Sequence, residues 1–71
     1  YENKIDKEIL KREINNLEER EKEIMILRYG LNNTNEYTQK EVADILNISQ
    51  SYISRIEKKV IKKLQVLMNN N

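Results

Sequence analysis

Residues 38–63 read TQKEVADILNISQSYISRIEKKVIKK and contain two helical patterns separated by a short turn. The first pattern opens with Thr38, followed three residues later by Glu41, which is the spacing of a capping box at a helix N-terminus. Apolar residues then recur at helical spacing, so a helix is expected to follow Thr38. Its inner face is predicted to consist of Val42, Ile45 and Leu46, with the small Ala43 at the crossing with the next helix.

The turn between the two patterns is expected at Asn47, because asparagine adopts the left-handed backbone conformation more readily than other non-glycine residues. Ser49 is a good N-cap for the following helix, which meets no helix-breaking residue before the asparagines at 69–71. Two short patterns joined by such a tight turn are typical of a helix-turn-helix. In that motif the second helix enters the major groove of DNA.

The second helix of this motif has two distinct faces at about 100° per residue. The apolar face, expected to pack on the rest of the domain, consists of Ile53, Ile56, Val60, Leu64 and Leu67. The opposite face consists of Gln50, Ser51, Ser54, Arg55, Lys58 and Lys62. Gln50 has an amide suited to bidentate contact with adenine, and Arg55 a guanidinium suited to guanine. Lys58 and Lys62 lie further along the helix, where phosphates are contacted.

Charge is distributed unevenly along the chain, although the net charge is only +1. Residues 1–36 carry seven Lys and Arg against nine Asp and Glu, giving −2, and residues 37–71 carry six against three, giving +3. Positive potential is therefore concentrated on the segment that would approach phosphates. A polar helix face with lysines is often only solvated, but the caps, the turn residue and the basic final helix agree and favour DNA binding.

The N-terminal part is expected to form two further helices. Apolar residues at spacings of three to five predict a first helix over about residues 3–15, and they are Ile5, Ile9, Leu10, Ile14 and Leu17. Asn16 and Glu19 have the capping-box spacing and predict that the second helix starts there. Gly30 fits the left-handed residue past its end, with Leu31 as the apolar contact of a Schellman motif. A polar loop is expected at 32–37.

Composition excludes several classes of function. The 71 residues contain no cysteine and no histidine, which removes disulfides, thiolate or imidazole metal sites and nucleophile–histidine pairs. Acidic residues are interspersed with basic ones and no glycine-rich phosphate loop is present, so we expect no enzyme, no metal and no cofactor. The longest apolar run is four residues, so neither a membrane span nor a signal peptide is expected, and the cytoplasm is the natural location.

These patterns, with no proline and one glycine, predict an all-α fold. We expect one four-helix domain over residues 1–71, with a helical pair at 1–31, a C-terminal helix-turn-helix at 38–67 and no wing. Because the chain begins with Tyr1 rather than methionine, it is expected to be a fragment of a longer protein.

Two blocks of sequence occur in order, separated by a short polar loop. The first is LEEREKEIMILRYGL at 17–31, and the second is YTQKEVADILNISQSYISRIEKKVIKKL at 37–64. Together they resemble region 4 of bacterial sigma-70-type RNA polymerase sigma factors, whose marker positions fall on Leu17, Arg20–Glu21 and Arg28–Tyr29–Gly30. The resemblance covers about residues 15–67. Its last segment is most similar to the mother-cell sporulation sigma factors of endospore-forming Firmicutes.

The resemblance implies a domain of an alternative sigma factor that recognises the promoter −35 element and docks on the β-flap of RNA polymerase. The family's base-reading positions fall on Gln50, Ser51, Ser54 and Arg55, and its phosphate-contacting positions on Arg20, Arg28, Thr38 and Gln39. Positions where housekeeping members meet activators fall on Lys59, Lys62 and Lys63. The implied partners are promoter DNA, the polymerase core and activators or an anti-sigma factor, with the isolated domain monomeric.

Housekeeping members carry an Arg-Glu and an Arg-Gln pair at the reading positions, where this chain has Gln50–Ser51 and Ser54–Arg55. It is therefore not expected to read the housekeeping −35 sequence. Two other interpretations stay open. One is the helix-turn-helix output domain of a stand-alone LuxR-type regulator, which would dimerise on two half-sites. The other is a pure protein-interaction module whose basic helix is only solvated.

Overall fold

The structure is a computed structural model that describes residues 7–69, with side chains to residue 67. Over this range the chain forms four α-helices and one turn of 3-10 helix, in agreement with the predicted all-α class. They are α1 (Lys7–Glu13), η1 (Ile14–Asn16), α2 (Glu19–Tyr29), α3 (Gln39–Leu46) and α4 (Gln50–Asn69). Ile5, which was placed in the first helix, lies outside the described residues.

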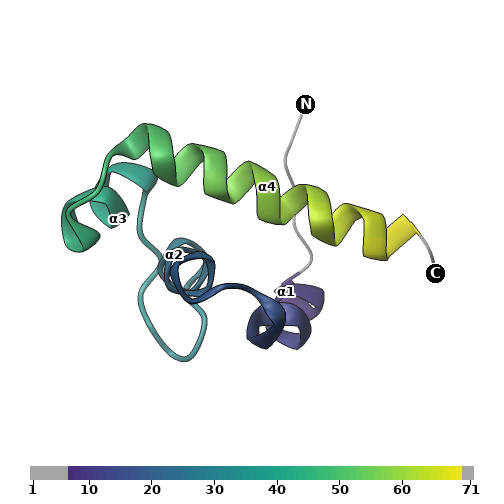
Figure 1. Cartoon of the computed structure of the whole chain (residues 1–71). Coiled ribbons are helices and arrows are strands. Elements are labelled where there is room, and N and C mark those ends of the chain that lie inside the picture. Colours follow the sequence, from purple (N-terminus) through teal and green to yellow (C-terminus); the bar gives the residue numbers. More distant parts are fainter. Residues whose placement is uncertain (1–6, 70–71) are drawn as a thin grey trace.

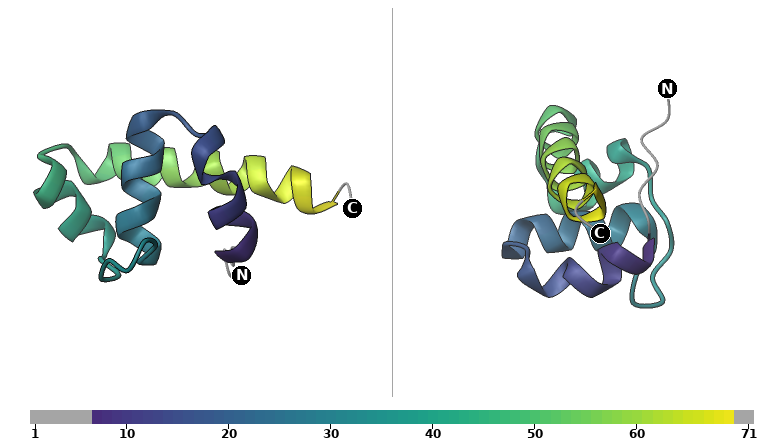
Figure 2. Two further views of the ribbon diagram at one scale, coloured as in Figure 1. Left: turned by 90° about the horizontal axis from the view of Figure 1, so that it is seen from below. Right: turned by 90° about the vertical axis from the view of Figure 1, so that its right-hand side faces the viewer.

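Three short helices lie in a row along one side of the long helix α4 (Figure 1). Seen from below, α3 lies at the start of α4, α2 crosses its middle, and α1 lies beside its second half (Figure 2, left). Within residues 7–69, no helix is both long enough and apolar enough to cross a membrane. The arrangement leaves the far side of α4 without a covering helix in the described part of the chain.

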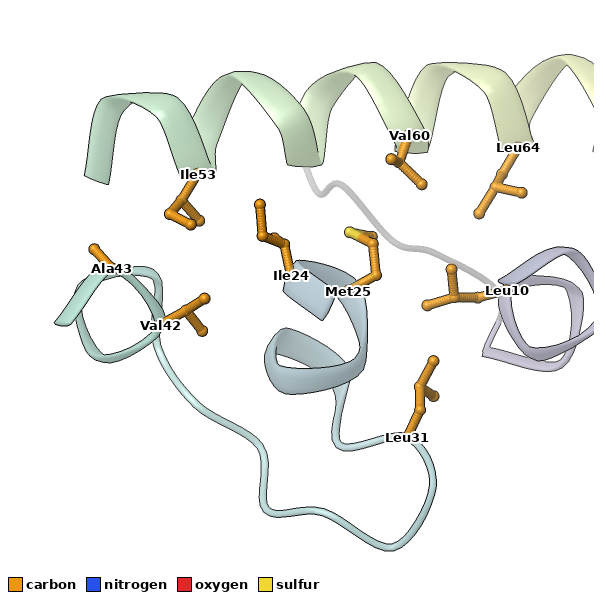
Figure 3. Close-up of a cluster of buried hydrophobic side chains, with 9 residues drawn as sticks. All are labelled: Leu10, Ile24, Met25, Leu31, Val42, Ala43, Ile53, Val60 and Leu64. Atoms are coloured by element: carbon orange, nitrogen blue, oxygen red, sulfur yellow. The ribbon is translucent and has the colours of Figure 1, made fainter. Parts of the chain in front are cut away.

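The core fills the space between α4 and the three short helices (Figure 3). Each helix contributes to it, so the core ties the helix-turn-helix to the N-terminal pair. Burying an aliphatic side chain of this size stabilises the fold by about 1.5–3 kcal/mol. The members are Leu10, Ile24, Met25, Leu31, Val42, Ala43, Ile53, Val60 and Leu64.

Local signals fixed several helix ends as predicted. Gly30 adopts the left-handed conformation with φ 64°, and the Leu31 N–H donates to the Ile26 carbonyl at 3.0 Å, which closes α2 in a Schellman motif. At the start of α3, the Thr38 N–H donates to Glu41 Oε1 at 2.8 Å and the Glu41 N–H donates to Thr38 Oγ1 at 3.2 Å. Both groups of the predicted capping box are therefore paired.

The start of the second helix was predicted wrongly. Asn16 lies in η1, where its side-chain amide donates to Glu13 Oε1 at 2.9 Å, and it caps no helix. The chain then becomes extended, and α2 begins one residue after Glu18, whose backbone N–H donates to Glu21 Oε1 at 3.2 Å. Several polar residues in this stretch are followed three positions later by glutamate, and the pair Glu18 and Glu21 forms the cap.

Two residues assigned to the core are exposed. Ile45 is 52% exposed, because the buried pair Val42 and Ala43 sets the direction of α3, and Ile45 falls about 110° from the middle of that pair. Leu67 is 43% exposed, because the last turns of α4 extend beyond α1 (Figure 1). Ile61 is buried instead and completes the inner face of α4.

Candidate nucleic-acid interface

The turn between α3 and α4 has the geometry of a helix-turn-helix. Asn47 is left-handed with φ 58° and ψ 47°, and the Ile48 N–H donates to the Ala43 carbonyl at 3.0 Å. Ser49 Oγ accepts a hydrogen bond from the Tyr52 N–H at 3.1 Å, which caps the start of α4. The predictions for Asn47 and Ser49 are confirmed, and the first residues of α4, Gln50 and Ser51, are exposed directly after the turn.

Polar side chains from α3 and α4 line a shallow hollow beside the first two turns of α4. Its walls are Gln39, Gln50, Ser51 and Ser54. Gln50 and Ser51 are exposed and Ser54 is half-buried. The structure therefore brings three of the four residues expected to read bases to one place, and adds Gln39, which was expected to contact phosphate.

A second hollow lies on the other side of the opening turns of α4 and joins residues distant in sequence. Arg20 at the start of α2 lines it together with Arg55, and the remaining walls are Ile48, Ser49 and Tyr52. Arg20 also lies 3.6 Å from Glu23 in an exposed ion pair, which leaves the guanidinium accessible. Two guanidinium groups thus border one depression, which is a suitable environment for a DNA backbone or a guanine edge.

The lysines of α4 differ in their surroundings. Lys58 and Lys62 are exposed, and neither forms an ion pair within residues 7–69. Lys59 and Lys63 are instead directed toward the start of α2, with their Nζ atoms 3.1 Å and 3.6 Å from the carboxylate of Glu21. The charge available to a phosphate is consequently greatest at Lys58 and Lys62.

Glu21 is a buried carboxylate that sequence reasoning did not assign to the core. It is 2% exposed. Burial opposes its ionisation, but the Lys59 ammonium, the Glu18 N–H and the charge of Lys63 outweigh this effect and hold the pKa of Glu21 below its ordinary value. The Glu21 carboxylate in turn raises the pKa of Lys59. The ion pairs of Glu21 with Lys59 and Lys63 connect α4 to the N-terminus of α2.

A second buried carboxylate, Glu57 in α4, binds side chains from both α2 and α3. Arg28 donates to it through Nε at 2.9 Å and through Nη2 at 3.1 Å, and the Tyr29 hydroxyl donates to Oε2 at 2.8 Å. Gln39 Nε2 donates to Oε1 at 2.9 Å. We call Arg28, Tyr29, Gln39 and Glu57 the Glu57 cluster. It joins the end of α2, the start of α3 and the middle of α4.

The contacts within the Glu57 cluster shift the pKa values of three of its members. Burial by itself would raise the pKa of Glu57, but hydrogen bonds from Arg28, Gln39 and Tyr29 and the charge of Arg28 hold it below its ordinary value. Burial and the hydrogen bond to Glu57 raise the pKa of Tyr29. Burial opposes the charge on Arg28, yet the Glu57 carboxylate raises the pKa of Arg28 overall. The cluster therefore holds one full negative and one full positive charge at neutral pH.

The cluster gives Arg28 a structural role that the sequence did not predict. Its Nε and Nη2 groups are bound to Glu57, and Nη1 donates to the Tyr37 carbonyl at 2.8 Å. Arg28 is therefore directed into the domain, and its expected contact with phosphate stays a prediction. Glu57 is the only acidic residue after Gln50, and at about 100° per residue it falls within the apolar stripe of α4. Those two features could have identified it.

The domain is all-helical, contains a helix-turn-helix and exposes polar side chains on the first turns of α4. These features define a DNA-binding class of protein. The chain matches the model of the family "Sigma-70, region 4" over residues 14–66, and so it belongs to that family. This confirms the resemblance found in the sequence and excludes the stand-alone LuxR-type alternative.

Individual relatives agree with the family match. The chain is 56% identical over 68 residues to the RNA polymerase sigma-E factor of Clostridium acetobutylicum, which covers 96% of this chain and 29% of that protein. It is 49% identical over 65 residues to the RNA polymerase sigma-F factor of Bacillus subtilis, covering 92% and 24%. It is 47% identical over 57 residues to the sigma-K factor of the same species, covering 80% and 19%. The chain thus spans less than a third of these relatives' lengths. No solved structure matches it.

Proposed function

We propose that the chain is the DNA-binding domain of an alternative, sporulation-type sigma factor. It recognises the promoter −35 element and docks on the β-flap of RNA polymerase to direct transcription initiation in the bacterial cytoplasm. Membership of the sigma-70 region 4 family supports this proposal. The observation that carries it is the exposed polar start of α4, which directly follows the turn of a capped helix-turn-helix.

Base reading is assigned to the first two turns of α4 in the major groove. The Gln50 amide can form two hydrogen bonds with adenine, and the Arg55 guanidinium can form two with guanine. Ser51 and Ser54 are short, so the helix backbone can approach the base edges closely. Because these side chains differ from the housekeeping pairs, the preferred element is expected to differ from the housekeeping −35 sequence.

Phosphate contacts are assigned to residues around the groove-facing turns. Lys58 and Lys62 supply charge along α4, and Arg20 supplies it from α2. Thr38 is exposed, and its hydroxyl hydrogen is available because its oxygen is the group that accepts from Glu41. With about three charged contacts, log K should fall against log salt with a slope of roughly −3. Affinity in isolation is expected to be weak.

Lys59 and Lys63 are proposed as contacts for an acidic activator. Both remain about half exposed although they pair with Glu21. An acidic partner would compete with Glu21 for the two ammonium groups.

Fluorescence anisotropy tests the proposal with three labelled duplexes: a housekeeping −35 element, an A-rich alternative element and a scrambled control. We expect the chain to prefer the alternative element, with affinity falling between low and moderate salt. Equal binding to all three duplexes, or no binding, would contradict sequence-specific DNA recognition by this domain. The remaining alternative is a pure protein-interaction module, which predicts binding to the isolated β-flap and indifference to DNA sequence.

A further inference from the structure

Gln39 is the first residue of α3, and one side of its amide is already engaged. Gln39 Nε2 donates to Glu57 Oε1 at 2.9 Å. An ionised carboxylate only accepts hydrogen bonds, so the NH2 group must be the part of the amide that faces Glu57. The carbonyl oxygen is bonded to the same carbon at about 120° from the nitrogen, and it is therefore turned away from the cluster.

The orientation of Gln39 is held firmly because Glu57 is itself fixed. Arg28 binds both carboxylate oxygens, and the Tyr29 hydroxyl binds Oε2. Glu57 is 6% exposed, so water does not readily replace these donors. The amide of Gln39 consequently has one preferred orientation before any DNA is present.

Gln39 is also one of the residues that line the hollow at the start of α4. Gln50, Ser51 and Ser54 form the other walls. No described residue, with side chains followed from 7 to 67, donates a hydrogen bond to the side-chain Oε1 of Gln39. The hollow therefore holds an unpaired acceptor next to the side chains assigned to base reading.

The chemistry of this acceptor selects its partner. Phosphate oxygens are themselves acceptors and cannot pair with a carbonyl oxygen. In the major groove the donors are the exocyclic amino groups, adenine N6 and cytosine N4. We propose that Gln39 is a specificity-determining residue whose carbonyl oxygen accepts a hydrogen bond from the amino group of an adenine or cytosine. Glu57 acts as the positioning residue that fixes the orientation. This inference rests on the proposed function.

The experiment compares the DNA preferences of the wild-type chain with those of Gln39→Met and Gln39→Ala. Each chain is used to select from a duplex library randomised over about ten base pairs, roughly one helical turn. Gln39→Met keeps the length of the side chain and removes the acceptor, whereas Gln39→Ala removes the acceptor without adding apolar bulk. Gln65→Met, a glutamine in the second half of α4, is the matched control. Helical circular dichroism shows that each variant is folded.

We expect both Gln39 variants to lose preference at one adenine or cytosine position and to keep it elsewhere. At that position, purine in place of adenine, or 2-pyrimidinone in place of cytosine, removes only the amino group. This change should weaken wild-type binding roughly tenfold and should leave the Gln39 variants within about twofold. Gln65→Met should behave as the wild type.

Other results separate the inference from the proposed function. If the Gln39 variants keep the full wild-type preference, the inference is wrong and the proposed function stands. If the Gln39 variants bind all duplexes more weakly by the same factor, the second amide hydrogen contacts phosphate and the inference is again wrong. If the wild-type chain selects no sequence at all, both fail.

Discussion

Arg55 and Lys62 lie on the same side of α4 but are assigned to different parts of DNA. Replacing Arg55 with alanine should reduce discrimination between the preferred duplex and a duplex changed at the guanine position by about 1–3 kcal/mol. Replacing Lys62 with alanine should weaken binding to every duplex similarly and reduce the salt slope by about one. Anisotropy titrations of both variants against matched and mismatched duplexes measure the difference. A uniform loss in Arg55→Ala would assign Arg55 to the backbone instead.

Glu57 is expected to matter for stability far more than its position on a basic helix suggests. Glu57→Gln removes the charge that pairs with the Arg28 guanidinium, which is 22% exposed. Leaving a largely buried charge without its partner costs several kcal/mol, so we expect the free energy of unfolding to fall by about 2–4 kcal/mol. Urea unfolding followed by circular dichroism measures this loss. Lys58→Gln changes the charge of an exposed neighbour and should change stability by less than about 0.5 kcal/mol.

Sequence patterns predicted individual residues well where the physical cause is local. Thr38, Asn47 and Ser49 act through hydrogen bonds or backbone angles within three or four residues, and the structure confirms all three. The phosphate role of Arg28 was implied by the family resemblance, and its pairing with Glu57, 29 residues away, was not predicted. Helical periodicity contains no information about which distant charged residues will pair inside the domain.

At the level of the elements, the helix ends depend on two left-handed residues. Gly30→Ala introduces a Cβ at φ +64°, only 3.1 Å from the Thr34 carbonyl oxygen. We expect a loss of about 1–2 kcal/mol in the free energy of unfolding, measured by urea denaturation. Asn47→Gly is the matched control, because glycine has no Cβ and adopts the left-handed conformation of Asn47 without strain, so stability should change by less than about 1 kcal/mol. Equal losses in both variants would show that backbone strain is not the cause.

Elements were predicted less reliably where several patterns compete. Asn16 and Glu18 are each followed by glutamate three residues later, and only the second pair caps α2. Ile45 was assigned inward from its helical spacing to the other apolar residues, although Ala43 was already expected at the crossing with the next helix. That crossing turns Val42 and Ala43 toward the core and leaves Ile45 exposed. The choice is made by packing between helices, which sequence spacing alone does not encode.

For the whole molecule, stability is expected to depend on pH through its two buried carboxylates. The pKa values of Glu21 and Glu57 both lie below the ordinary 4.5 in the folded protein. Near and below pH 4.5 the unfolded chain therefore binds protons that the folded protein does not, and proton binding favours unfolding. The stabilisation is fully present above that pH and is lost as the pH falls through the lowered folded-state values.

Tyr29 produces the opposite dependence at high pH, because its pKa is raised above the ordinary 10.0. Its contribution is complete below pH 10 and is lost as the pH rises further, when the unfolded chain ionises first. We expect unfolding free energies from urea titrations to be level from about pH 6 to about pH 9 and to fall on both sides.

Glu57→Gln should be less stable throughout and show a shallower acid limb, and Tyr29→Phe should flatten the alkaline limb. If the acid limb of Glu57→Gln runs parallel to that of the wild type, then Glu57 does not account for the acid sensitivity, and Glu21 with its two lysines becomes the source to test.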